Sequence, residues 1–178
     1  EEVRFTVLGS GSSGNATYLE TGETRLLIDC GFSARQIKQR LATIKRIPDR
    51  LDGILVTHEH SDHIGAARIL SNKLKKRGGK TVPFYMTEGT RDGAPEKCMP
   101  EAVRLVEAGR AFDVGPLRVD PFTVPHDVRD PVAYRVGVGE RWVGVVTDLG
   151  RPTSLVAEKL RTLSIAILEF NHDLEMLL

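Results

Sequence analysis

The sequence predicts a single α/β domain over residues 1–178, and two observations carry this prediction. The chain has 178 residues, of which 40% are hydrophobic, so it can bury one sizeable core. Helix and strand patterns alternate in its first half, whereas from about residue 103 the pattern is mainly short apolar or alternating runs separated by Gly, Pro and Asp. The sequence contains no repeat, linker or low-complexity segment.

The composition sets limits on location and partners. The net charge is +1 and the pI is about 8.1, so the overall charge demands neither nucleic acid nor an anionic membrane. The sequence has no apolar leader and no apolar run near the roughly 18 residues of a membrane span, which predicts a soluble, cytoplasmic protein. Cys30 and Cys98 are too few for a disulfide scaffold, and we expect two reduced thiols, with Cys30 buried.

A glycine-rich segment follows the first predicted strand, at residues 3–8. Residues 9–14 match the G-x-G-x-x-G pattern of dinucleotide-binding sites, and Asp29 lies where such a site wants an acid. That pattern also needs a helix to begin at the third glycine. Instead, two strand patterns at 17–20 and 24–29 flank a Gly turn, which predicts a hairpin and no nucleotide cofactor.

Two helices are predicted in the first half. Ser33 and Gln36 form a capping box that begins the first helix, and Pro48 is expected to end it. Its inner face has three apolar residues at helical spacing: Ile37, Leu41 and Ile44. The opposite face is basic from Arg35 to Lys45. The second helix is predicted over about 64–77.

Basic residues gather at the end of the second helix: Lys73, Lys75, Lys76 and Arg77. Two interpretations stay open. Cations at a helix carboxyl end favour the macrodipole, so this can be an ordinary solvated terminus. The same residues can instead contact the phosphates of a nucleic acid.

The remaining elements are mostly strands. A strand is predicted at 81–86, followed by a short helix and loop up to 100. Four further strands are expected at 103–106, 117–124, 132–138 and 142–147. A last helix is expected to start near Pro152, with an inner face of Leu155, Val156 and Leu160, and to lead into a buried strand at 163–169.

The segment 53–63 predicts a metal site. A buried strand pattern at 54–56 leads into four side chains that bind metals: His58, His60, Asp62 and His63. In extended backbone His58 and His60 point to the same side, about 6–7 Å apart, so both can reach one ion. The next two ligands can reach a second ion, because dinuclear sites hold their metals about 3.5–4 Å apart. A solvated polar turn is the alternative.

Three more candidate groups follow predicted strands: His126, Asp148 and His172. Loops at strand ends are where rigid scaffolds place chemistry. A cluster at 58–63 needs ligands from elsewhere in the chain to complete two coordination shells, so these groups are candidates to supply them.

Together these residues resemble the metallo-β-lactamase fold superfamily. The motifs occur in the order of that family: L-I-D-C-G at 27–31, T-H-x-H-x-D-H at 57–63, His126, and T-D-L-G at 147–150. Three more segments resemble its YycJ (WalJ) branch of DNA exonucleases: G-S-G-S-S-G-N at 9–15, P-H-D-x-x-D-P at 125–131 and E-x-N-H-D at 169–173. The resemblance covers the whole chain.

The resemblance implies a four-layer αββα sandwich, with two mostly antiparallel sheets face to face, helices outside and a dinuclear site on loops along one edge. The implied ligands are His58, His60 and His126 for metal one, Asp62 and His63 for metal two, and Asp148 as a bridge. Asp29 would orient an imidazole through its far nitrogen, as metal-bound histidines usually require. Alternatively, Asp29 is a strand-end carboxylate that accepts backbone N–H groups.

Two departures from other branches narrow the chemistry. His60 stands where flavodiiron oxygen reductases have a glutamate, which favours hydrolysis over redox chemistry. Asp148 stands where true β-lactamases have a cysteine ligand, which favours harder metals and the phosphodiesterase and thioesterase branches. The resemblance also calls for a further histidine for metal two after Leu178. We therefore expect that the native chain continues, or that metal two binds weakly, and that the strand at 163–169 is partly uncovered.

The function implied is hydrolysis of DNA phosphodiester bonds, as a 5′-to-3′ exonuclease, by a hydroxide that two zinc or manganese ions share. Asp62 is the candidate to orient or deprotonate the water, and His172 to protonate the leaving oxygen or contact the phosphate; a structural loop histidine is an equal alternative for His172. Three other functions stay open: an RNase Z-like RNA nuclease, a glyoxalase II-like thioesterase, or a non-catalytic metal or nucleic-acid binding module.

Overall fold

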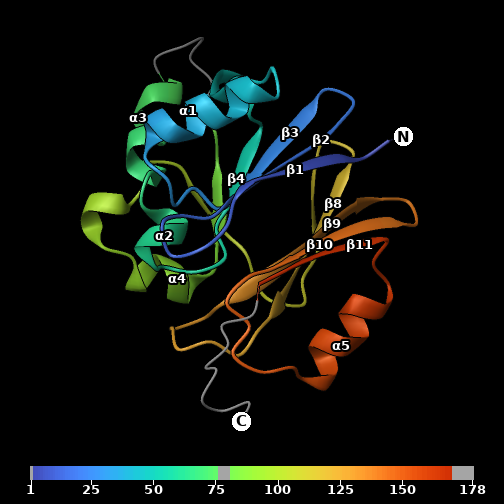
Figure 1. Cartoon of the computed structure of the whole chain (residues 1–178). Coiled ribbons are helices and arrows are strands. Elements are labelled where there is room, and N and C mark those ends of the chain that lie inside the picture. Colours follow the sequence, from blue (N-terminus) through green and yellow to red (C-terminus); the bar gives the residue numbers. More distant parts are fainter. Residues whose placement is uncertain (1, 76–80, 170–178) are drawn as a thin grey trace.

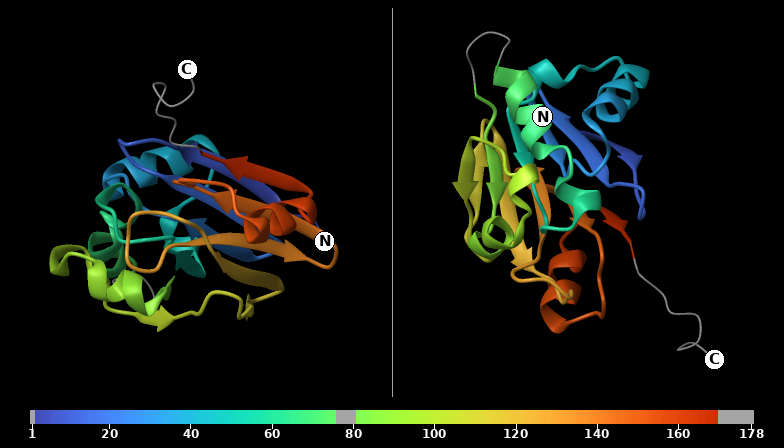
Figure 2. Two further views of the ribbon diagram at one scale, coloured as in Figure 1. Left: turned by 90° about the horizontal axis from the view of Figure 1, so that it is seen from below. Right: turned by 90° about the vertical axis from the view of Figure 1, so that its left-hand side faces the viewer.

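The computed structural model describes residues 2–75 and 81–169 and arranges them in four layers (Figure 1). A six-stranded sheet and a five-stranded sheet pack face to face, with helices on the outer side of each (Figure 2). The αββα architecture implied by the resemblance is therefore confirmed. Within the described ranges, no helix has both the length and the apolar character that crossing a membrane would require.

The first sheet has the strand order β1-β2-β3-β4-β5-β6. Its strands are β1 (Arg4–Gly9), β2 (Ala16–Thr21), β3 (Thr24–Ile28), β4 (Gly53–Leu55), β5 (Phe84–Met86) and β6 (Val103–Leu105). The β2–β3 hairpin is confirmed, and it occupies the place where a dinucleotide fold would have a helix.

The expectation of a mostly antiparallel first sheet is wrong. Strands β1 to β3 are antiparallel, but β3 to β6 run parallel. The reason is that each connection between the parallel strands crosses over through helical segments, and parallel neighbours require such crossovers. These helices are α1 (Ala34–Thr43), α2 (Ser61–Ile64), α3 (Ala67–Lys75) and α4 (Glu88–Gly93).

The second sheet has the order β11-β10-β9-β8-β7. Its strands are β7 (Phe112–Val114), β8 (Leu117–Thr123), β9 (Val132–Val138), β10 (Arg141–Val146) and β11 (Ile165–Leu168), and α5 (Ser154–Arg161) precedes β11. Strands β8 and β10 are each antiparallel to β9. They therefore run in the same direction, and their carboxyl ends lie at the same end of the sheet. The short strand β7 was not predicted, because three residues are too few to show a period.

Three apolar clusters hold the layers together. One joins α1 and α3 to the outer face of the first sheet, and includes the fully buried Ile37, Leu41 and Ile54. A second lies between the sheets, and a third joins α5 to the second sheet. Each buried aliphatic side chain contributes roughly 1.5–3 kcal/mol. Tyr134 in the middle cluster also donates its hydroxyl to the Val56 carbonyl at 2.9 Å, which ties the two sheets together.

The helix predictions need three corrections. The Ser33–Gln36 capping box is present, but α1 ends at Thr43, well before Pro48, and Lys45 follows with a φ of 57°. The predicted second helix is divided into α2 and α3, and α2 begins at Ser61. The helix is interrupted because the Ala66 N–H donates to the Cys30 carbonyl and not to a carbonyl of the same helix. Helix α5 begins after its cap at Thr153, so Pro152 lies outside the first turn.

The last strand and helix also differ in burial from the prediction. The predicted inner face of α5 is confirmed for Val156, which is fully buried, and for Leu160, which packs against the same cluster, but it is wrong for Leu155, which is 41% exposed. Strand β11 is the edge of its sheet, and Ile165 and Leu168 are exposed, so the prediction of a buried strand is wrong while that of an uncovered one is confirmed. Cys30 and Cys98 are free and buried, as expected for thiols in a core.

Candidate metal centre

The strand topology brings four loops to one edge of the sandwich. Strands β3 and β4 run parallel, so Asp29 and the segment from Thr57 to His63 follow their ends side by side. In the facing sheet His126 follows β8 and Asp148 follows β10. The Val132 N–H donates to the Thr57 carbonyl at 3.0 Å, which fixes the two sheets to one another at this edge.

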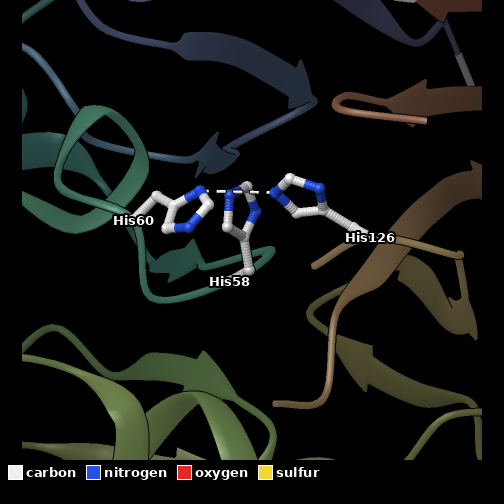
Figure 3. Close-up of side chains that lie close together, drawn as sticks. All are labelled: His58, His60 and His126. Atoms are coloured by element: carbon white, nitrogen blue, oxygen red, sulfur yellow. Dashed lines mark hydrogen bonds between the residues drawn. The ribbon is translucent and has the colours of Figure 1, made fainter. Parts of the chain in front are cut away.

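Three histidines form the first group of potential ligands. His58, His60 and His126 point toward one another from the two sheets, and each offers a nitrogen within 4.8 Å of the others (Figure 3). The His60 Nδ1 and His126 Nε2 atoms are 3.3 Å apart. The three imidazole rings are packed edge to face, with centroids 4.7–5.0 Å apart. A set of three imidazoles leaves an open position for water on a bound ion.

A second group shares His58 with the first. It consists of His58, His63 and Asp148, whose ligand atoms also lie within 4.8 Å of one another. The Asp148 Oδ2 atom is 2.7 Å from His63 Nε2 and 3.6 Å from His58 Nε2. Asp62 places its Oδ2 atom 3.5 Å from the same His63 nitrogen. Asp148 therefore lies beside His63 and beside His58, the residue that the two groups share.

Asp29 contacts both the His63 ring and the backbone at Thr57. Its Oδ2 atom is 2.8 Å from His63 Nδ1, and its Oδ1 atom accepts the Thr57 N–H at 2.8 Å. The Thr57 hydroxyl also donates to Oδ2 at 2.8 Å. Both alternatives for Asp29 from the sequence thus occur in one carboxylate. Asp29 and Asp148 both have left-handed backbone, with φ of 61° and 52°, which non-glycine residues adopt at a cost of about 1–3 kcal/mol, typically at functional sites.

Burial and charge shift the histidine pKa values in opposite directions. Burial, together with the neighbouring His63 and His126, lowers the pKa of His58 to about 2. For His63, burial acts in the same direction, but Asp29 and Asp148 outweigh it and raise the pKa to about 10. Burial also lowers the pKa of His126. The neighbouring acids therefore favour protonation of His63, whereas burial disfavours protonation of His58.

These residues fit divalent metal ions. The Nε2 atom of His58 is buried, and among the described residues it has no hydrogen-bond partner, although a buried polar atom normally finds one. Imidazole and carboxylate donors are the ligands that zinc, manganese and similar ions accept. The site is therefore built for a divalent metal.

Two residues near the centre were missed in the sequence. Glu59 lies between the two predicted ligands His58 and His60, and its Oε1 atom accepts the Arg129 N–H at 3.0 Å, which anchors the loop that carries His126. Gly31 has no room for a side chain, because a Cβ atom would lie 1.5 Å from the Asp62 carbonyl oxygen. The alternation around His58 and His60 could have pointed to Glu59, since it must face the opposite side.

Some predicted site residues lie elsewhere. Lys73 lines a groove between α1 and α3. Lys75 is the last residue of α3, whereas Lys76, Arg77 and His172 lie outside the described residues, so their predicted roles stay predictions.

Comparison with known proteins identifies the class. The Beta-lactamase superfamily domain matches residues 24–177, so the chain belongs to this superfamily. In solved structures, the fold is similar to that of a diphosphatase from the PhnP family, with a TM-score of 0.72 and 23% identity over 94% of this chain and 74% of that one.

The branch follows from two curated relatives. The chain is 34% identical to the exodeoxyribonuclease WalJ of Streptococcus pneumoniae serotype 2 (strain D39 / NCTC 7466), over 98% of its own length and 64% of that protein. It is 31% identical to the exodeoxyribonuclease YycJ of Bacillus anthracis, over 98% of its own length and 65% of that protein. The chain thus spans slightly less than two thirds of these relatives, and the similarity supports the YycJ-type branch.

Proposed function

We propose that this chain carries the hydrolase centre of a metal-dependent DNA exonuclease. The observation that carries the proposal is the pair of ligand groups that meet at His58, one of three imidazoles and one that includes Asp148. Two ions about 3.5–4 Å apart, with open positions for water and substrate, suit phosphodiester hydrolysis. The similarity to proteins named exodeoxyribonucleases supports DNA as the substrate.

The proposed ligands follow the two groups. In this proposal His58, His60 and His126 would hold metal one, Asp62 and His63 would hold metal two, and Asp148 would be shared by both. The position of the Asp148 Oδ2 atom, 2.7 Å from His63 and 3.6 Å from His58, supports the bridging role. The ions are zinc or manganese, because both accept imidazole with carboxylate.

The mechanism assigns separate tasks to the side chains. Bound divalent ions supply a water of lowered pKa and polarise a phosphoryl oxygen. The Asp62 side chain is 28% exposed, so its carboxylate can orient an incoming water and accept its proton. Asp29 keeps His63 oriented through the Nδ1 contact of 2.8 Å. His172 is proposed to protonate the leaving oxygen or contact the phosphate.

A basic groove is the proposed path for the DNA strand. It has a volume of about 710 Å³ and lies between α1 and α3. Arg35, Lys38 and Lys73 line it, and within the described part of the chain none of the three forms an ion pair. Helix α1 begins just after Gly31, whose backbone lies against Asp62, so the groove begins near the metal centre. Asp49 also lines the groove, so the proposal rests on the excess of three cations over one carboxylate, which suits a phosphate backbone.

The test is digestion of end-labelled single- and double-stranded DNA with manganese, magnesium and zinc in turn. The proposal predicts metal-dependent release of nucleotides from the 5′ end, and none after treatment with a chelator. The matching RNA and a thioester substrate serve as controls. Preference for RNA would instead assign an RNase Z-like activity, thioester cleavage would assign a glyoxalase II-like activity, and metal binding without any hydrolysis would assign a binding module.

A further inference from the structure

Asn15 is a buried polar residue that the mechanism above leaves without a task. It lies between the glycine-rich segment 9–14 and β2, and only 3% of its surface is exposed. No charge or ligand chemistry marks it in the sequence. In the structure, however, its side chain contacts both of the residues proposed to hold metal two, Asp62 and His63.

The orientation of the Asn15 amide is determined by its surroundings. The Oδ1 atom accepts the Gly11 N–H at 3.0 Å, and only an oxygen can accept there. The Nδ2 group must then face the other way. It lies 3.0 Å from His63 Nε2 and 3.4 Å from Asp62 Oδ2, the two atoms proposed to bind metal two. It also lies 3.4 Å from the Asp62 carbonyl oxygen and 3.2 Å from the Gly11 carbonyl oxygen.

The backbone of Asn15 holds the same turn. Its N–H donates to the Asp62 carbonyl at 2.7 Å, and its carbonyl accepts the Gly31 N–H at 3.0 Å. These bonds survive any substitution of the side chain. The side-chain amide can therefore be removed while the path of the chain between Gly31 and Asp62 keeps its backbone contacts.

Asp62 needs this contact more than the other proposed ligands do. It lies in the first turn of α2, a helix of only four residues that no side chain caps. Its carboxylate is partly exposed, whereas His63 is fully buried and fixed by Asp29. A free carboxylate samples several rotamers, and ordering it on metal binding costs conformational entropy. A donor aimed at Oδ2 removes part of that cost beforehand.

We propose that Asn15 is a positioning residue for metal two, whose amide donates toward the Asp62 carboxylate and packs against the His63 ring, so that both side chains keep the arrangement that a second divalent cation requires. The proposal rests on the proposed function only in that it takes Asp62 and His63 as ligands. Contacts outside the ligand shell typically change metal affinity about 10- to 100-fold. Asn15 thus gives the glycine-rich segment a task in metal binding, in place of a nucleotide site.

The test compares Asn15→Ala with a matched control, Ser10→Ala, in the full-length chelator-treated protein. Ser10 belongs to the same segment, but its hydroxyl donates to Glu169 and not to a proposed ligand. Zinc titrated by calorimetry should show two ions in the wild type and in Ser10→Ala. In Asn15→Ala the second ion should bind about 10- to 100-fold more weakly, and the first should bind as before. The visible absorption of the cobalt-loaded protein should lose the contribution of the second site.

The possible outcomes separate this inference from the proposed function. Two ions bound to Asn15→Ala with wild-type affinity would overturn the inference and leave the nuclease proposal intact. A wild type that binds no divalent metal would overturn both. If Asn15→Ala does not fold by circular dichroism, Asn15→Ser is measured instead, because its hydroxyl is too short to reach His63. Unfolding of both variants would mean that Asn15 is purely structural, which also contradicts the inference.

Discussion

The metal centre and the cluster around Glu20 are two groups of poorly exposed polar side chains that are built in opposite ways. Around Glu20 the charges are paired: the carboxylate accepts hydrogen bonds from Arg46 Nε and from the Tyr18 hydroxyl, both at 2.8 Å. These contacts lower the pKa of Glu20 to about 2, with the Arg46 hydrogen bond as the largest cause. Nothing in this cluster calls for a further ligand.

In the metal centre, by contrast, imidazoles face imidazoles. The rings of His58, His60 and His126 meet with centroids no more than 5.0 Å apart, and within the described ranges His58 Nε2 lacks a hydrogen-bond partner. Such an arrangement does not stabilise the fold by itself, since unmatched buried polar groups cost free energy. The Glu20 cluster is therefore complete without a ligand, whereas the metal centre is completed by a cation.

The largest effect is expected from breaking the metal centre. His126→Ala should lower kcat/KM on end-labelled DNA by at least about 10²- to 10³-fold, the loss typical of removing one group that stabilises the transition state. The same change should reduce bound metal. Circular dichroism should show a folded domain, because His126 lies on a loop. The control is Glu20→Gln, which should leave kcat/KM unchanged. Full activity of His126→Ala would show that His126 is not part of the metal centre.

A smaller effect is expected from replacing Asp29, which contacts the proposed ligand His63 but is not itself a proposed ligand. Asp29→Asn keeps the shape of the side chain but removes the negative charge beside His63 Nδ1, so metal affinity should fall about 10- to 100-fold. Calorimetry with zinc measures this directly. Asp52→Asn is the matched control, because it makes the same change of charge at a carboxylate outside the metal centre, which accepts the Arg25 N–H. Equal losses in both variants would mean that the effect of Asp29→Asn does not come from its contact with His63.

The Glu20 cluster should respond in stability and not in activity. Because the folded-state pKa of Glu20 is about 2, below its usual value of 4.5, its stabilisation is present above about pH 4.5 and is lost as the pH falls toward 2. Arg46 is 32% exposed, so solvent screening reduces the contribution to about 1–2 kcal/mol. Urea unfolding of Glu20→Gln should show this loss at pH 7 and a smaller loss near pH 3. A constant difference at both pH values would contradict the assignment.

The smallest effect concerns the groove between α1 and α3. Replacing Lys73 by Gln should make the salt dependence of DNA binding shallower by about one unit of log–log slope, since one phosphate contact is lost. Sequence preference should not change. Lys97→Gln, in the 3₁₀ segment Glu96–Cys98 and outside the lining of the groove, is the control. An unchanged slope for Lys73→Gln, Lys38→Gln and Arg35→Gln would mean that these residues do not contact phosphates and belong to an ordinary solvated surface.

Much of the fold could be predicted because its signals are local. The Ser33–Gln36 capping box, the β2–β3 hairpin and the apolar run before His58 each depend on neighbouring residues. The parallel direction of β3 to β6 could not be derived in this way, because it depends on which strands pair after each helical crossover. Burial of β11 was misjudged for a related reason: an apolar run reads the same at the edge of a sheet as in its centre.

The candidate site divides in the same manner. Histidines and acids at strand ends could be singled out by their chemistry, and the structure brings His58, His60, His63, His126 and Asp148 together. Their supporting contacts could not be found, because the partners of Asn15 and Glu59 lie far from them in the sequence. A neutral amide carries no signal in one sequence until its neighbours in space are known.

The central claim, that the histidine and aspartate centre is built for divalent cations, is tested most directly by thermal unfolding of the chelator-treated protein with and without zinc. At about 100 times the dissociation constant, the bound ion should add about 2.7 kcal/mol. For a domain of this size that should raise Tm by about 5–11 °C. Glu20→Gln should keep the full rise and His58→Ala, which removes the ligand shared by both groups, should lose most of it. No rise in the wild type, or an equal rise in His58→Ala, would contradict the account.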